Sequence, residues 1–329
     1  MIVTFGEWVA LIFALCALVL AFGVLVGSYI TYRMAFYRNP KKHRANPYNG
    51  IKNDGSEISA RSRAMVDNIL SLQFEDIYTT SFDGLPLRAR LYLKDSSLPF
   101  AIQVHGYKST PMLDFSGGGQ LALDLGMNVI MIDQRAHGES GGRCISFGHN
   151  EKRDLLSWID YVISRFGEGS EIILFGISMG GATVILASEL DLPKNVLGVF
   201  ADCPYSSAAD MIRKTASEMH LPKRAAYALS RLGARIFGGF DPDEAEPIRA
   251  IKNARVPIII VHGEKDGFVP ADMSRAMAEA NPIVELHTFP NADHGLSYLY
   301  DSDRYRSIVK NGVSSFLKRD ASVNIERKP

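Results

Sequence analysis

The sequence predicts an α/β fold in which helices cover both faces of a mostly parallel sheet, preceded by one membrane-spanning helix. From residue 74 onward, strand-like and helix-like runs alternate, which is typical of a doubly wound sheet. The later strand-like runs ("VIMID", "IILF", "VLGVF", "PIIIVHG") are almost continuously apolar, as in strands that are covered on both faces. The first 33 of the 329 residues differ in composition and form a separate segment.

This N-terminal segment carries no charged side chain from Trp8 to Tyr32. At about 1.5 Å per residue, a helix of this length can cross a hydrocarbon core about 30 Å thick. The alternative is a cleaved signal peptide, which would need a basic start and a shorter apolar core, whereas the only early charge is Glu7. We therefore predict an uncleaved transmembrane anchor over residues 1–33.

Basic residues follow this anchor and none precedes it; they are Arg33, Arg38, Lys41, Lys42 and Arg44. The positive-inside rule then places the rest of the chain in the cytoplasm, as in a single-pass membrane protein. We interpret these charges as a solvated juxtamembrane segment that touches lipid headgroups.

The overall charge and the cysteine content argue against several classes of protein. The 36 basic and 36 acidic side chains cancel, so the net charge gives no indication of a nucleic-acid partner. Cys16, Cys144 and Cys203 are too few and too scattered for a disulfide framework or a zinc site. We expect no metal and no organic cofactor.

The rest of the chain divides into a linker, a folded domain and a tail. Residues 34–72 are predicted to be a juxtamembrane linker ending in a short helix over residues 58–72, because Asn, Pro, Gly and Lys are frequent in residues 39–57. The folded domain is predicted over residues 73–320, and a flexible tail over 321–329. Strands are expected at Phe74–Thr80, Leu87–Leu93, Phe100–His105, Asn128–Asp133, Glu171–Gly176, Val196–Asp202, Pro257–His262 and Val284–Phe289. Helices are expected at Gly118–Leu125, Glu151–Phe166, Met179–Leu190, Met273–Ala280 and Arg304–Leu317.

Two connections are informative. Asp83-Gly84 between the first two strands predicts an antiparallel hairpin. Residues 206–243, between the sixth and seventh strands, are long, helical and mixed in polarity, and they interrupt the alternation. Such an insertion either covers a site at the carboxyl end of the sheet or merely covers the sheet edge, and the sequence favours neither interpretation.

Ser178 is the candidate nucleophile. A serine hydroxyl must protrude from a sharp turn between a strand and a helix, and this turn requires glycine two positions before and after it. Gly176 and Gly180 occupy these positions, with "IILF" before them and "ATVILA" after them. The context predicts a reactive serine rather than an ordinary glycine-rich turn.

The partners of such a serine follow it in the order acid, then histidine. Asp266 stands just past the seventh strand in "VHGEKDGFVP", and His294 stands just past the eighth in "FPNADHG". Asp202 is the competing acid, although it could instead cap the insertion or hydrogen-bond within its loop. His105 and His262 lie at strand ends and are interpreted as loop-packing histidines. We therefore predict that His294 is the base and that Asp266 orients it.

Charge that develops on a substrate carbonyl oxygen needs fixed N–H donors. The helix that starts at Met179 offers its first unpaired N–H groups, and the loop after the third strand offers the N–H of Tyr107. We predict an oxyanion hole from these two backbone groups. The Tyr107 side chain is interpreted as packing rather than as a substrate contact.

Five motifs together, "HGY", "DQRAHGESGG", "GISMGG", "HGEKDGFVP" and "DHG", resemble the α/β-hydrolase superfamily over residues 74–318. The branch is the one that contains small serine esterases, monoacylglycerol-lipase-like enzymes and prolyl-oligopeptidase-like hydrolases. The resemblance implies an eight-stranded sheet and a small helical cap between strands six and seven. It also implies a triad of Ser178, Asp266 and His294 and an oxyanion hole at Tyr107 and Met179.

The expected function is hydrolysis of carboxylic esters by a membrane-anchored serine hydrolase, with small-molecule ester substrates and no nucleic-acid partner. The anchor and the cap favour lipid-like acyl substrates. One alternative is a peptidase or amidase that uses the same triad. The other is an inactive, membrane-tethered binding module.

Overall fold

Eight strands form one sheet in the computed structural model of the chain, which describes residues 4–38, 46–48, 51 and 53–326, with side chains as far as residue 318. The strands are β1 (Glu75–Thr80), β2 (Pro86–Tyr92), β3 (Phe100–Val104), β4 (Asn128–Ile132), β5 (Ile172–Ile177), β6 (Val196–Asp202), β7 (Ile258–Gly263) and β8 (Val284–Phe289). Each lies within one residue of its predicted bounds, and the predicted fold class is confirmed.

The strand order is β1-β2-β4-β3-β5-β6-β7-β8. The hairpin of β1 and β2 is antiparallel, as Asp83-Gly84 predicts, and β2 is also antiparallel to β4. All later pairs are parallel. The chain leaves β3 toward β4 on one side and returns to β5 on the other. This reversal creates a crevice beyond the carboxyl ends of β3 and β5, where ligands bind in open α/β sheets.

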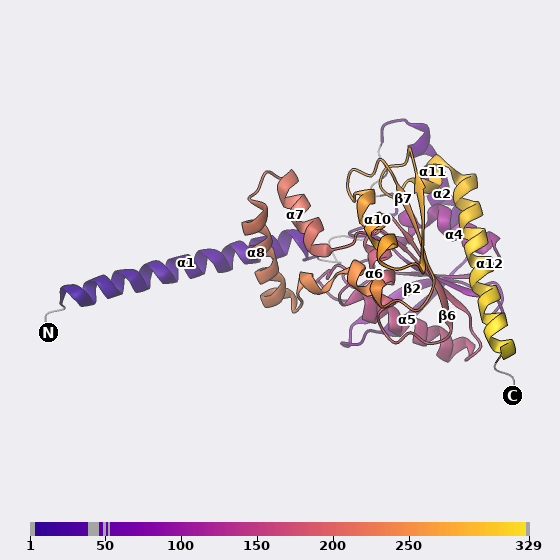
Figure 1. The fold of residues 1–329 in the computed structure, drawn as a ribbon, viewed down its shortest axis with the longest axis horizontal. Helices are drawn as coiled ribbons and strands as arrows, with labels where there is room; N and C mark the ends of the chain where they lie inside the picture. Colours follow the sequence, from indigo (N-terminus) through magenta and orange to yellow (C-terminus); the bar gives the residue numbers. More distant parts are fainter. Residues whose placement is uncertain (1–3, 39–45, 49–50, 52, 327–329) are drawn as a thin grey trace.

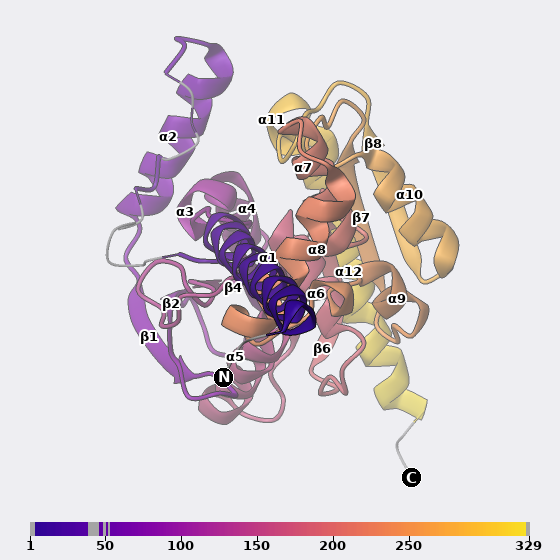
Figure 2. The same ribbon diagram turned by 90° about the vertical axis from the view of Figure 1, so that its left-hand side faces the viewer.

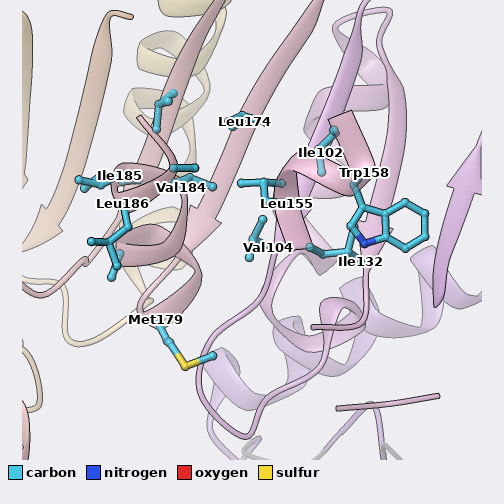
Figure 3. Close-up of a cluster of buried hydrophobic side chains, with 14 of the residues drawn as sticks. Ile102, Val104, Ile132, Leu155, Trp158, Leu174, Met179, Val184, Ile185 and Leu186 are labelled. Atoms are coloured by element: carbon cyan, nitrogen blue, oxygen red, sulfur yellow. The ribbon is translucent and has the colours of Figure 1, made fainter. Parts of the chain in front are cut away.

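Helices cover both faces of the sheet. Successive side chains of a strand point to opposite faces, so the helices on each face bury apolar side chains of the strands. One face is covered by α2 (Glu57–Ser71), α4 (Ser116–Asp124) and α12 (Ser302–Glu326). The other is covered by α5 (Glu151–Phe166), α6 (Met179–Ala187), α9 (Pro247–Lys252) and α10 (Ala271–Ala280). Figure 3 shows part of the second core, in which Trp158 of α5 and Val184 of α6 lie with Ile102 and Leu174 of the strands.

Helix α1 (Phe5–Ala35) extends away from the domain, and only its last turns contact the rest of the chain (Figure 1). It has a mean hydropathy of 3.1 in its most apolar window and is long and apolar enough to cross a membrane. Figure 2 views the domain with α1 projecting toward the reader beside α8. The predicted anchor ends two residues earlier than this helix.

The insertion between β6 and β7 packs on the end of α1. It contains α7 (Ala208–Glu218), α8 (Lys223–Gly233), a π-helical turn (Ala234–Gly238) and the short η2 (Pro242–Glu244). Gly233 of α8 lies so close to α1 that a Cβ there would be 2.2 Å from the carbonyl oxygen of Ser28. The Tyr29 ring meets that of Phe237 edge-on, with centroids 5.1 Å apart. The insertion therefore connects the apolar helix to the sheet.

The interpretation of the juxtamembrane charges as solvated is wrong for Arg38. Arg38 is only 6 % exposed, because its backbone N–H donates to the carbonyl of Arg143 at 2.9 Å while Tyr37 forms a β-bridge with Cys144. Residues 36–38 directly after α1 therefore pack into the domain. Arg33 is exposed and lies over the Tyr37 ring. The other predicted charges, Lys41, Lys42 and Arg44, lie outside the described residues.

Other differences concern the ends of elements. Helix α12 continues to Glu326, past residue 320, where the sequence places the start of a tail. Three short helices were not predicted: α3 (Pro111–Asp114), α9 and α11 (Ser297–Tyr300). With four to six residues each, they are too short to show a helical period in the sequence.

Candidate active site

Ser178 lies at the turn between β5 and α6 with φ 55° and ψ −116°, a conformation that non-glycine residues rarely adopt. The two flanking glycines make this turn possible. A Cβ on Gly176 would be 2.2 Å from the carbonyl oxygen of Gly180, and a Cβ on Gly180 would be 1.8 Å from that of Val104. The serine is thus held in a strained turn at the carboxyl end of β5.

The structure brings Ser178, His294 and Asp266 together. His294 Nε2 lies 2.9 Å from Ser178 Oγ, and His294 Nδ1 lies 2.7 Å from Asp266 Oδ2. Ser178 follows β5, Asp266 follows β7 and His294 follows β8, so three strand ends on the same side of the sheet supply the three side chains. These contacts allow a proton to pass from the serine hydroxyl to the imidazole while the carboxylate holds the ring.

Asp266 is held ionised by its surroundings. Its Oδ1 accepts hydrogen bonds from the backbone N–H groups of Phe268 and Val269, at 2.9 and 2.7 Å. Burial alone would raise the pKa of Asp266, but hydrogen bonding to His262 and His294 outweighs it, so the pKa lies well below its ordinary value. His262 is completely buried, and its Nδ1 and Nε2 lie 2.7 Å from Ser274 Oγ and 2.9 Å from the Val269 carbonyl. It therefore packs the loop that carries Asp266, as predicted.

Asp202, the competing acid, is nearby but contacts neither the serine hydroxyl nor the imidazole. Its backbone carbonyl accepts from the N–H of Ser178 at 2.8 Å, and its buried Oδ1 has no hydrogen-bond partner among the described residues. Burial raises its pKa to about 6. It does not cap the insertion either, because Ser207 Oγ accepts the capping hydrogen bond of α7.

The predicted oxyanion donors flank Ser178. Met179 is the first residue of α6, whose leading N–H groups have no acceptor within the helix. Tyr107 follows β3 in a loop that passes directly over the serine, since a Cβ on Gly106 would be 3.4 Å from Ser178 Cβ. Half-buried Asp114 holds this loop: its Oδ2 accepts from the Gly106 N–H at 2.6 Å and its Oδ1 from Ser109 Oγ at 2.5 Å.

The remaining polar residues of the predicted motifs stabilise loops. His105 is completely buried, and its Nε2 accepts from the Gln134 N–H at 3.2 Å. Arg135 binds both oxygens of Asp154 at 2.6 Å, and Asp133 pairs with Arg88 at 3.3 Å. These contacts fix the loop after β4 without reaching the serine.

Two cavities meet at Ser178. The larger, of about 660 Å³, extends between α2, α4 and α11, and its lining residues include Asp54, Asp114 and Asp202. The smaller, of about 340 Å³, extends toward α1 under the insertion and is lined mostly by apolar side chains. Residues of the insertion thus line a cavity that includes Ser178, which favours the first of the two interpretations that the sequence left open.

Within the part of the chain that the structure describes, one group of side chains has metal-ligand spacing. The ligand atoms of Cys203, Asp266 and His294 lie within 4.8 Å of one another. The oxygen and nitrogen atoms of the latter two already bond each other and Ser178, so the arrangement is explained by hydrogen bonding.

Two contributions to the site were missed. Asp114 gives no sequence signal beyond an acid shortly after a strand. Met34 and Ala35 at the end of α1 line the smaller cavity, although they are more than 140 residues from Ser178 in the chain. A pattern read along the sequence cannot reveal such a contact.

Comparison with known proteins places this geometry in context. The model of a family described as "Alpha/beta hydrolase family" matches residues 104–308. YqkD of Bacillus subtilis, an uncharacterized protein, is 27% identical over 192 residues, which are 58% of this chain and 63% of YqkD. The thiohydrolase aneE of Aspergillus aculeatus is 29% identical over 138 residues, which are 41% of this chain and 43% of aneE. The matches thus span less than two thirds of either relative.

Solved structures share the fold at low sequence identity. The Pyrococcus furiosus esterase Pf2001 has a TM-score of 0.59 and 23% identity, over 77% of this chain and 93% of that protein. The esterase RhEst1 of Rhodococcus has a TM-score of 0.53 and 16% identity, over 73% and 99%. At such identities the likeness concerns the fold alone.

Proposed function

The chain belongs to the alpha/beta hydrolase family, and from this premise we propose that it is a serine hydrolase that cleaves carboxylic esters through an acyl-enzyme. The observation that carries the proposal is the unbroken hydrogen-bonded series from Ser178 Oγ through the His294 ring to Asp266, placed on a strained turn. The geometry of the site supports this proposal more than sequence identity does, because the two contacts of His294 join the groups that the mechanism needs.

In the proposed mechanism, Ser178 Oγ attacks the ester carbonyl carbon while His294 Nε2 takes the hydroxyl proton. The negative charge on the carbonyl oxygen is stabilised by the N–H groups of Tyr107 and Met179. The tetrahedral intermediate then collapses, the bond to the alcohol oxygen breaks, and His294 returns its proton to that oxygen. Water attacks the resulting acyl-enzyme with the same base, which releases the acid and restores the serine.

The acid of this triad is Asp266. Its carboxylate accepts the Nδ1–H of His294, which directs Nε2 toward the serine and stabilises the imidazolium that forms. The bonds from Phe268 and Val269 keep the carboxylate ionised and in place.

Related acyl transfers remain as alternatives. The name of aneE favours thioesters as a second substrate class, because the same attack on a carbonyl carbon releases a thiol. A peptidase or amidase would use the same residues on a poorer leaving group. An inactive binding module is not favoured, since His294 is within hydrogen-bonding distance of both Ser178 and Asp266.

We further propose that α1 anchors the enzyme in a membrane, with the catalytic domain on the cytoplasmic side. The length and hydropathy of α1 support the anchor, and the basic residues after it support the orientation. A membrane-impermeant maleimide tests the orientation on an Asn53→Cys variant, with wild type as the background control. Labelling is expected only after the cells are permeabilised. Labelling of intact cells would place the catalytic domain on the outer side of the membrane and contradict the proposal.

Ester hydrolysis itself is tested with the purified full chain and a panel of esters, thioesters and amides. Ser178→Ala is expected to lose at least about 10³-fold in kcat on the best substrate. Ser164→Ala, an exposed serine on α5, is the matched control and should retain wild-type activity. Turnover of amides but not of esters would favour the amidase alternative, and no turnover of any substrate would favour the binding module.

A further inference from the structure

We propose that the last turns of α1 form one wall of the acyl-chain subsite, so that the hydrocarbon chain of the substrate lies between the membrane helix and the insertion. The substrate class is then an ester with a single long acyl chain, dissolved in the bilayer that holds α1. This inference rests on the proposed ester hydrolysis and goes beyond it, because it makes the anchor a determinant of specificity.

The smaller cavity connects the nucleophile to α1. Its lining includes Ser178 and, from α1, Thr31, Met34 and Ala35. These three residues are spaced three and four apart, so they share one face of the helix. The insertion supplies most of the remaining wall, through Met211, Ile212, Ala216, Met219, Leu221 and Ala226.

Polar groups along this wall are already bonded. Thr31 Oγ1 donates to the Ser28 carbonyl at 3.0 Å, and the Tyr107 hydroxyl donates to the Ala35 carbonyl at 2.6 Å. A hydrocarbon chain in this cavity would therefore leave these polar groups paired. Four aspartates are among the residues that line the larger cavity, namely Asp54, Asp114, Asp202 and Asp293, so we assign the leaving group to that cavity.

The mouth of the smaller cavity is apolar and accessible. Met34 of α1 is 51% exposed, and Met219 and Leu221 at the turn between α7 and α8 are 48% and 45% exposed, although all three line the cavity. Helix α8, which follows this turn, packs against the end of α1, and the long apolar part of α1 projects beyond it (Figure 1). An acyl chain from the bilayer would thus reach the serine along a continuous apolar surface.

The wall is fixed in position. The Lys108 side chain donates to the Met34 carbonyl at 3.1 Å, next to the Tyr107–Ala35 hydrogen bond. Gly233 of α8 packs against the Ser28 carbonyl on the other side of the helix end. The position of Met34 relative to the nucleophile is therefore set by direct contacts, as a specificity determinant requires.

The first test compares chain-length selectivity in the full chain reconstituted in phosphatidylcholine nanodiscs. In Met34→Trp the indole is expected to fill the cavity and lower the ratio of kcat/KM for a dodecanoyl ester over an acetyl ester at least about tenfold. Each buried methylene contributes about fourfold, so this corresponds to displacing about two of them. Ile30→Trp, one turn earlier and 52% exposed but outside the cavity, is the matched control and should keep the wild-type ratio.

The second test needs no substitution. An alkyl fluorophosphonate with a diazirine near the end of its chain labels Ser178 and is then photolysed. Crosslinks are expected in residues 31–35 of α1, together with residues 211–226 of the insertion. Crosslinks only in residues 113–121 or 298–309, around the larger cavity, would overturn the proposal.

The outcomes separate this inference from the proposed function. If wild type hydrolyses neither ester, the ester hydrolysis fails. If it hydrolyses both, and Met34→Trp keeps the same ratio as Ile30→Trp, only the role of α1 fails. If Met34→Trp does not fold, the crosslinked residues of wild type decide.

Discussion

The Tyr107 hydroxyl donates a 2.6 Å hydrogen bond to the backbone carbonyl of Ala35, and so joins the loop above the nucleophile to the last turn of the apolar helix. The ring of Tyr107 also stacks on Phe147, with centroids 5.1 Å apart. The side chain thus packs, as the sequence predicts, but its packing connects the membrane segment with the proposed oxyanion hole.

Removal of this hydroxyl should weaken catalysis. Tyr107→Phe keeps the ring stack but loses a hydrogen bond that contributes about 1 kcal/mol, so we expect kcat on the best ester to fall about three- to tenfold. The measurement is steady-state kinetics of the full chain. Tyr161→Phe on α5, whose hydroxyl accepts from Arg165 far from the site, is the control. Equal kinetics in the two variants would show that the bond to α1 does not position the loop.

The glycine after the nucleophile should be irreplaceable. A Cβ at Gly180 would overlap the Val104 carbonyl oxygen, so Gly180→Ala must move β3 or the turn. We expect the free energy of unfolding to fall by about 3 kcal/mol, together with loss of activity. Denaturant unfolding measures this, with Gly169→Ala as the control because a Cβ there meets no atom within 4 Å. A Gly180→Ala variant as stable as the control would contradict the described turn.

The identity of the acid can be tested with two matched substitutions. Asp266→Asn should lower kcat about 10⁴-fold, because the amide no longer holds the imidazole in its reactive tautomer. Asp202→Asn should stay within about tenfold of wild type, since its side chain touches neither Ser178 nor His294. If the two effects were exchanged, the orienting acid would have to be assigned to the end of β6.

Asp202 should also make stability depend on pH. Burial raises its pKa from an ordinary value of 3.8 to about 6, so between these values the folded chain keeps a proton that the unfolded chain loses. This contribution to stability is complete below about pH 4 and is lost as the pH rises through about 6. The Tm of Asp202→Asn minus the Tm of wild type should therefore be more positive at pH 8 than at pH 4.5. An equal Tm difference at both would refute the shift.

Much of the site was predictable because its residues obey local rules. Ser178 stands between two glycines after an apolar strand, and Asp266 and His294 each follow a strand in the required order. Parallel strands bring such ends to one edge of a sheet, so the three positions converge without any knowledge of packing. The strands themselves were predictable because they are buried on both faces and hence continuously apolar.

The remainder depends on contacts between distant segments. The charge of Arg38 on its own predicts an exposed side chain. The β-bridge between Tyr37 and Cys144 instead places Arg38 within the domain. Met34 follows the predicted anchor and gives no sequence signal of a site; the packing of α8 on α1 and the hydrogen bond from Lys108 bring it to the cavity. The role of Asp114 likewise depends on how the chain folds back over Gly106.

The most direct test of the account is the site at which a fluorophosphonate reacts with the full-length chain. Mass spectrometry of the intact protein should show one phosphonate per chain, and tryptic mapping should place it on Ser178 within the peptide of residues 166–194. The Ser178→Ala variant should take up none, and Ser164→Ala should label like wild type. Equal labelling of Ser178→Ala and wild type would contradict the assignment of Ser178 as the nucleophile.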